Sequence, residues 1–265
     1  VDADVAWSAT TGAGRKVAII DTGIYYSHPD LVGNVNKGPT YVKGTKSSND
    51  DNSHGTHVSG TVAAVNNTIG VIGAAWTTKL WGVKSLDRNG SGSYSSIISG
   101  INWSASNGMH QINMSLGGTF DSQALKDACN NAVAKGVFIA AAAGNSGDTT
   151  PNYPGAYSSV VCVSATDSNN NLAGFSTRGP QVDLAAPGVG VTSTVPTSGY
   201  ATWDGTSMAT PHVTGCAALV WAANPAFKNS DVRNRLQSKA IDLGAPGVDD
   251  QYGYGLVNAF NALTP

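Results

Sequence analysis

The chain has 265 residues, of which 41% are hydrophobic, so a packed core is expected and wholesale disorder is excluded. Charged residues make up only 12%, the net charge is -2, and no lysine/arginine run occurs, which argues against a nucleic-acid partner. All 17 acidic residues are aspartate, which excludes mechanisms that need glutamate, such as the H-E-x-x-H zinc site, the paired-glutamate glycosidases and the zinc deaminases.

Hydrophobic periodicity predicts strands and helices that alternate within a single domain, residues 1–265. In chain order these are a strand at 16–20, a helix at 56–64, a strand at 80–86, a helix at 93–106, a strand at 111–114, a helix at 121–135, strands at 137–142 and 160–165, and helices at 206–222 and 231–240. This alternation predicts an α/β fold with a doubly wound, mostly parallel central sheet and helices on both faces. Functional residues in such sheets lie at the carboxyl ends of the strands.

No membrane segment and no disulfide scaffold is expected. The apolar stretches are all shorter than the roughly 18 residues that a membrane span needs, and residue 1 starts directly in polar sequence, which gives no sign of a signal peptide. Cys129, Cys162 and Cys216 lack C-x-x-C spacing, and we expect three buried thiols. The alternatives are one disulfide between Cys129 and Cys162 or, least favoured, a catalytic cysteine.

Three polar residues lie at strand ends or helix starts. Asp21 follows the strand 16–20, His54 lies where a loop turns into a helix, and Ser207 lies where another loop enters a helix. Taken singly, Asp21 and Ser207 are more typical of helix caps or turns, and His54 is equally consistent with a surface residue and a functional one. Together they are the three parts of an acyl-transfer triad, in which serine attacks, histidine transfers the proton and aspartate orients the histidine.

Asn145 completes this set of candidate catalytic groups. It follows the predicted strand 137–142, so its side-chain amide can donate a hydrogen bond to an oxyanion near the same sheet edge. A serine at a helix N-terminus also gains from the positive end of the helix dipole, which favours developing negative charge.

Five motifs along the chain give a family resemblance. They occur at residues 17–24 (VAIIDTGI), 54–60 (HGTHVSG), 115–118 (SLGG), 141–145 (AAAGN) and 205–211 (GTSMATP). Through them the chain resembles the subtilisin-like serine proteases, the subtilase family, almost from end to end and close to the bacterial subtilisins. The resemblance implies that Ser207 is the nucleophile, His54 the general base and acid, and Asp21 its orienting group, with an oxyanion hole from the Asn145 amide and the Ser207 N–H. His57 is expected to be a packing residue.

The resemblance also implies a substrate cleft. Two extended segments, Ser115, Leu116 and Gly117 on one side and Ala142, Ala143 and Gly144 on the other, are expected to flank the substrate residue before the scissile bond. Their glycines predict a roomy, uncharged slot with Asn152 near its floor, and Tyr94, Ile97 and Leu116 resemble an apolar pocket further upstream. The expected specificity is a broad preference for large apolar or aromatic residues before the scissile bond.

Structural calcium is implied by the same resemblance. The expected ligands are the backbone carbonyls of Val65, Ile69 and Val71, the Asn67 side chain and the Asp30 carboxylate. Close relatives carry an N-terminal arm that supplies one more side-chain amide, and this sequence starts after it. A second, weaker cation site is expected at the carbonyls of Gly155, Tyr157 and Val160, with Asp183 nearby.

Relatives are made with a signal peptide and with a prodomain that assists folding and then inhibits. The resemblance therefore implies a processed, secreted, monomeric endopeptidase that acts on protein and peptide substrates and has its own prodomain as a partner. The competing interpretations are a catalytically inactive peptide-binding relative and a metallohydrolase that uses His54 and His57. A further hypothesis, cleavage after glutamate by an enzyme that lacks its own target residue, is disfavoured because no Lys or Arg lies in the cleft segments.

Overall fold

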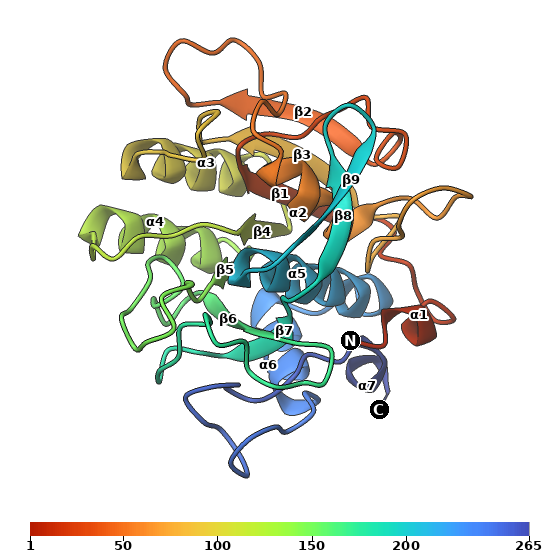
Figure 1. Cartoon of the computed structure of the whole chain (residues 1–265), viewed down its shortest axis with the longest axis vertical. Coiled ribbons are helices and arrows are strands. Elements are labelled where there is room, and N and C mark those ends of the chain that lie inside the picture. Colours follow the sequence, from red (N-terminus) through yellow and green to blue (C-terminus); the bar gives the residue numbers. More distant parts are fainter. Residues whose placement is uncertain (265) are drawn as a thin grey trace.

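A seven-stranded parallel sheet forms the centre of the protein, whose computed structural model describes residues 1–264 (Figure 1). The strand order is β2-β3-β1-β4-β5-β6-β7, and every neighbouring pair is parallel. The strands are β1 (Lys16–Asp21), β2 (Val35–Thr40), β3 (Lys79–Lys84), β4 (Gln111–Met114), β5 (Phe138–Ala142), β6 (Val161–Thr166) and β7 (Leu184–Pro187). The predicted doubly wound α/β fold is confirmed.

Helices cover both faces of this sheet because its strands are apolar on both sides. In β5, Ile139 and Ala141 pack into the cluster under α3 (Tyr94–Ser106) and α4 (Gln123–Ala134). The alternate residues Phe138 and Ala140 pack on the opposite face, against α5 (Thr206–Ala223). The remaining helices are α1 (Ala3–Ala6), α2 (His54–Ala63), α6 (Asn229–Ser238) and α7 (Ala259–Leu263).

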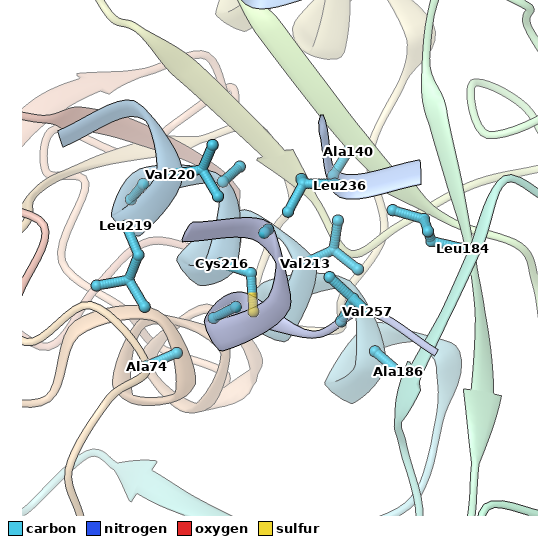
Figure 2. Packing of buried hydrophobic residues seen from close by; sticks show 14 of the residues in the cluster. Ala74, Ala140, Leu184, Ala186, Val213, Cys216, Leu219, Val220, Leu236 and Val257 are labelled. Carbon is cyan, nitrogen blue, oxygen red and sulfur yellow. The ribbon is translucent and has the colours of Figure 1, made fainter. Parts of the chain in front are cut away.

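Helix α5 is buried along nearly its whole length, as Figure 2 shows for Val213, Cys216, Leu219 and Val220.

All three cysteines are free and buried, which confirms the predicted thiols and excludes the disulfide between Cys129 and Cys162. Burial raises the pKa of the Cys129 and Cys216 thiols to about 12, so both stay protonated and unreactive near neutral pH.

Several elements were not predicted. Strand β2 lacks an alternating pattern because it is a half-buried edge strand, and β7 has only four residues. The hairpin of β8 (Val191–Val195) and β9 (Gly199–Trp203) packs on α2 rather than joining the main sheet. Strand β3 ends at Lys84, two residues before the predicted end, because the next two amides both donate to the Asp21 carbonyl.

The two ends of the described chain lie side by side, with α1 against α7 (Figure 1). The Ala259 amide donates to the Val1 carbonyl at 2.8 Å, and the Asn258 amide donates to Asp2 at 2.7 Å. Among residues 1–264, no helix has the length and apolar character needed to cross a membrane.

Candidate active site

The Asp21 carboxylate is hydrogen-bonded to the imidazole of His54 at the carboxyl end of the sheet. Asp21 is the last residue of β1 and His54 the first of α2. The two Asp21 oxygens lie 2.8 and 3.0 Å from His54 Nδ1. Because a carboxylate can only accept here, Nδ1 carries the proton and Nε2 is left as a free base.

Asp50, which the sequence did not point to, holds the segments that carry Asp21 and His54. Its buried carboxylate accepts from the Asn52 and Ser53 amides, at 2.9 and 3.0 Å, and from the amide and hydroxyl of Thr56 in the first turn of α2. It also accepts from the Thr22 hydroxyl at 2.8 Å, beside Asp21. A signal was present in the sequence, since an Asp shortly before a helix start is typical of N-terminal capping.

The environment of His54 has opposing effects on its pKa. Burial lowers the pKa of the imidazole, whereas the charge and hydrogen bond of Asp21, with the charge of Asp50, raise it. The attractive contributions prevail, so the His54 pKa lies above its ordinary value. His54 is therefore suited to accept a proton near neutral pH.

Ser207 lies in the first turn of α5, opposite the residues of the substrate cleft. Its hydroxyl donates to the Ser115 carbonyl at 3.0 Å, and the Ser115 hydroxyl donates to the Ser207 carbonyl at 2.8 Å. Ser115 and His54 line one cavity of about 520 Å³. Ser207 is thus hydrogen-bonded to a residue that lines the same cavity as His54, with its hydroxyl directed to the Ser115 carbonyl.

Two N–H donors converge above Gly205, just before Ser207. The Asn145 oxygen accepts from the amide and hydroxyl of Thr206, both at 2.9 Å, so the Asn145 Nδ2 is turned away from Thr206. A carbon placed at the missing Cβ of Gly205 would lie 3.6 Å from both Asn145 Nδ2 and Ser207 N. Met208 Sδ would lie 3.5 Å from the same carbon. The two N–H groups can stabilise a negatively charged oxygen that approaches both of them. Thr206 is a second orienting residue that the sequence analysis missed.

The predicted cleft residues also meet at this site. Tyr94, Ile97 and Leu116 line the cavity that contains His54, together with Ser115 and Gly117. Across the cleft, Ala142, Ala143 and Gly144 continue from β5 towards Asn145. Asn152 lies between the two segments, where its Nδ2 donates to the Ala142 carbonyl at 3.0 Å.

His57 is a packing residue, as predicted. Its Nε2 lies 3.2 and 3.1 Å from the carbonyls of Val191 and Ala201, and its ring stacks on Trp203 with centroids 4.4 Å apart. Burial lowers the His57 pKa to about 4, so the ring is neutral near pH 7. Within residues 1–264 no group of three or more His, Cys, Asp or Glu side chains is placed to hold a metal ion. No observation therefore favours the metallohydrolase interpretation.

The residues expected to bind calcium converge on Asp30. Its fully buried carboxylate accepts from Asn67 Nδ2 at 2.8 Å, the Val71 amide at 2.9 Å and the Tyr200 hydroxyl at 3.1 Å. A Cβ at Gly70 would collide with both Asp30 and Tyr200, so the loop can close over the carboxylate only with glycine there. All three donors are neutral, so these hydrogen bonds bring no positive charge to the buried carboxylate. A carboxylate without a cationic partner is a group that a hard cation such as calcium can bind.

The second predicted cation site does not fit a metal ion. The Asp183 carboxylate accepts from the Cys162 amide at 2.9 Å and forms an ion pair with Arg233 at 2.7 Å. The guanidinium also donates to the Ser158 carbonyl at 2.7 Å. The Arg233 guanidinium therefore already neutralises Asp183, the carboxylate that was expected near the carbonyls of Gly155, Tyr157 and Val160.

Known proteins match this chain over nearly its full length. The model of the Subtilase family matches residues 12–255. Subtilisin Savinase of Lederbergia lenta is 51% identical over 249 residues, which are 94% of this chain and 90% of that protein. An alkaline protease of Shouchella clausii is 51% identical over 94% of this chain and 64% of its own length. Alkaline elastase YaB of Bacillus sp. (strain YaB) is 50% identical over 98% of this chain and 67% of its own length. With this agreement along the sequence, the chain belongs to the subtilase family and is a serine protease of the subtilisin type.

Proposed function

We propose that Ser207, His54 and Asp21 are the catalytic triad of this endopeptidase, with Asn145 and the Ser207 N–H as its oxyanion hole. The observation that carries the proposal is the contact of both Asp21 oxygens with His54 Nδ1, next to two donors that converge over Gly205. No observation favours the alternative of an inactive peptide-binding relative.

In the proposed mechanism, Ser207 Oγ attacks the peptide carbonyl carbon while His54 Nε2 takes the hydroxyl proton. Asp21 stabilises the imidazolium that forms, and the Asn145 amide and the Ser207 N–H stabilise the oxyanion. His54 then protonates the leaving amine, the C–N bond breaks, and an acyl-enzyme remains on Ser207. Water, deprotonated by His54, attacks this ester, and the serine is regenerated by the same steps in reverse.

The substrate is proposed to bind as an extended strand between residues 115–117 and 142–144, which offer main-chain hydrogen bonds. The cavity of about 520 Å³ next to His54 supports an upstream subsite for a large apolar side chain, because Tyr94, Ile97 and Leu116 line it. Protein and peptide substrates follow from this mode of binding.

A serine-directed phosphonyl fluoride tests the proposed function. With calcium held constant, we expect one label per chain, on Ser207, and peptidase activity that falls in proportion to labelling. Activity that persists without labelling would favour a metal-dependent route, and absence of any peptidase activity before treatment would favour the inactive relative.

Replacing Asn145 with Leu is expected to lower kcat by about 10²–10³, the magnitude known for the corresponding amide of subtilisin, with KM nearly unchanged. The amide acts on charge that is present only in the transition state, so ground-state binding is little affected. Steady-state kinetics on a chromogenic peptide provide the measurement. The exposed Asn169→Leu is the matched control, and a loss confined to KM would contradict the assignment.

We further propose a structural calcium ion at the Asp30 loop, held by the carboxylate, the Asn67 side chain and the carbonyls of Val65, Ile69 and Val71. The ion would supply the positive charge that the buried Asp30 lacks. Support comes from the neutral donors around Asp30 and from the closure of the loop over it.

Chelation of calcium is expected to lower Tm by about 5–10 °C, because an ion at about 100 times its Kd contributes about 2.7 kcal/mol to a chain of this size. The measurement uses the Ser207→Ala variant, which cannot digest itself, with excess calcium or excess chelator. Asp30→Asn should abolish the calcium response, and Asp127→Asn on the exposed face of α4 should keep it. An unchanged Tm on chelation would reject the site.

We also propose that the enzyme is secreted and monomeric and that its own prodomain assists folding and inhibits it. The support is its membership of the family, in which these features are expected.

A further inference from the structure

A charged lysine is buried beside the proposed triad. Lys84 is the last residue of β3, where it pairs in register with Asp21 of β1, and its side chain is fully buried. Lysine is almost never fully buried without partners. Its ammonium group donates to the Asp51 carboxylate at 2.6 Å and to the carbonyls of Thr22 and Leu86, at 2.6 and 3.0 Å. Three acceptors match the three N–H groups of the charged form.

The three acceptors belong to three different segments of the active site. Thr22 directly follows Asp21, and Asp51 lies three residues before His54, in the loop that leads into α2. Leu86 lines the cavity of about 520 Å³ together with His54. One buried ammonium group therefore joins the turn after the aspartate, the loop before the histidine and a wall of the cavity.

We propose that Lys84 is a positioning residue for the catalytic pair Asp21 and His54. By binding Thr22 and Asp51 at once, its ammonium group sets the distance between the segments that carry the two catalytic side chains. The contacts of both Asp21 oxygens with His54 Nδ1, at 2.8 and 3.0 Å, depend on that distance. This inference rests on the proposed function, since it assigns a residue that acts through the triad.

Thr22 transmits the effect of Lys84 to the carboxylate of Asp21. The Thr22 amide donates to Asp21 Oδ1 at 2.7 Å, so it is one of the groups that orient this carboxylate. The Thr22 hydroxyl donates to Asp50 at 2.8 Å and accepts from the Gly55 amide at 2.9 Å. Asp50 and the start of α2 thus hold the side chain of Thr22, and Lys84 holds its carbonyl.

Asp51 supplies the charge that balances the buried ammonium group. Its side chain is 44% exposed, whereas that of Lys84 is fully buried, so Asp51 reaches inward from the surface. Without Asp51, water can take the place of one acceptor on this exposed side. Without Lys84, the carbonyls of Thr22 and Leu86 lose a donor at a site that water does not reach. Removal of Lys84 should therefore disturb the site more than removal of Asp51.

The variant Lys84→Met tests the proposal, because methionine keeps much of the apolar stem and removes the ammonium group. We expect kcat on a chromogenic peptide to fall about 10²-fold, the loss that a displacement of about 1 Å can cause, with KM within about threefold. Asp51→Ala should lower kcat by about three- to tenfold, as water replaces one contact. Lys135→Met, exposed at the end of α4, is the matched control and should keep full activity.

A double-variant cycle separates positioning of the pair from support of the fold. In Asp21→Ala there is no carboxylate left to position, so adding Lys84→Met should lower kcat by less than about threefold. A residue that only supports the fold would cause the same fold loss with and without Asp21. Thermal unfolding of each variant, measured on the Ser207→Ala background, reports folding separately from kcat. If Lys84→Met does not fold, Asp51→Ala takes its place in the same cycle.

Three results would each overturn the inference in a variant that folds. These are a kcat equal to that of the unmodified chain, an equal fold loss in the presence and absence of Asp21, and a loss confined to KM, which would place the effect of Lys84 on the cavity wall at Leu86. Failure of the proposed function is recognised separately, since the unmodified chain would then neither be labelled on Ser207 nor cleave the peptide.

Discussion

Replacing Ser207 with Ala is expected to lower kcat by about 10⁶, the magnitude known for loss of the nucleophile in subtilisin itself. The methyl group removes the only atom placed to form the acyl-enzyme, while the cleft and the two donors over Gly205 stay in place. Substrate should therefore still bind, with Kd close to the KM of the unmodified enzyme. Single-turnover hydrolysis of a chromogenic peptide and calorimetric titration of an uncleaved peptide supply the two measurements.

The matched control is Ser106→Ala, an exposed serine at the end of α3, which should retain full activity. The Tm of Ser207→Ala should differ little from that of the inhibited enzyme, because within residues 1–264 the hydroxyl makes one hydrogen bond, to Ser115. Adding His54→Ala to Ser207→Ala should lower kcat little further, since the two side chains act as one unit. A further large and multiplicative loss in the double variant would show that His54 acts by another route.

The sequence predicts the proposed catalytic residues because they belong to short, local motifs. Asp21 ends an apolar strand, His54 starts a helix and Ser207 enters one, so each pattern can be recognised within a few residues. The contacts that link distant segments could not be predicted in this way. Tyr200 reaches Asp30 across 170 residues, and nothing near either residue indicates the other.

The substrate slot illustrates the same limit. The sequence predicts Gly117 and Gly144 beside the cleft, because glycine permits close approach of a ligand backbone. Whether the slot is open depends on the direction of the Asn152 side chain, and that direction is set by the Ala142 carbonyl and by the bridge between Gly118 and Tyr153. Such tertiary contacts are not encoded in the local pattern.

The contacts of the buried aspartates give a physical reason for aspartate, and not glutamate, at several positions of this chain. Asp21 accepts from the amide of the next residue at 2.7 Å, and Asp50 accepts from amides two, three and six residues ahead. These are turn and capping contacts, which favour the shorter side chain. Asp30 and Asp183 likewise accept backbone amides at 2.9 Å. At these positions an extra methylene would move the carboxylate out of register with its donors.

Replacing Asp21 with Asn is expected to lower kcat by about 10⁴, the loss known for the same change in trypsin, a serine protease of unrelated fold. The carboxamide can turn its NH₂ group towards His54 Nδ1, which would move the ring proton to Nε2. In that tautomer Nε2 cannot accept the Ser207 proton. The hydrogen bond between residue 21 and His54 Nδ1 would remain, but His54 could no longer take the proton from Ser207.

The pH dependence provides a second readout for this variant. In the unmodified enzyme the pKa of His54 is raised above its ordinary value of 6.5, so kcat/KM should rise with pH through a limb centred above 6.5. Without the Asp21 charge, the lowering by burial prevails, and the remaining activity should show its limb at lower pH. Asp127→Asn should leave both the rate and the limb unchanged.

The Tm values of the unmodified enzyme and of Asp21→Asn should differ most at low pH, below the limb of the activity profile. A histidine with a raised pKa in the folded state stabilises the fold fully below its unfolded-state pKa, and this contribution is lost as pH rises through the folded-state pKa. The Tm deficit of Asp21→Asn should therefore be larger below pH 6.5 than above the limb, when both proteins are measured on the Ser207→Ala background. A limb that stays in place, together with a pH-independent Tm deficit, would show that Asp21 supports the fold without orienting or charging His54.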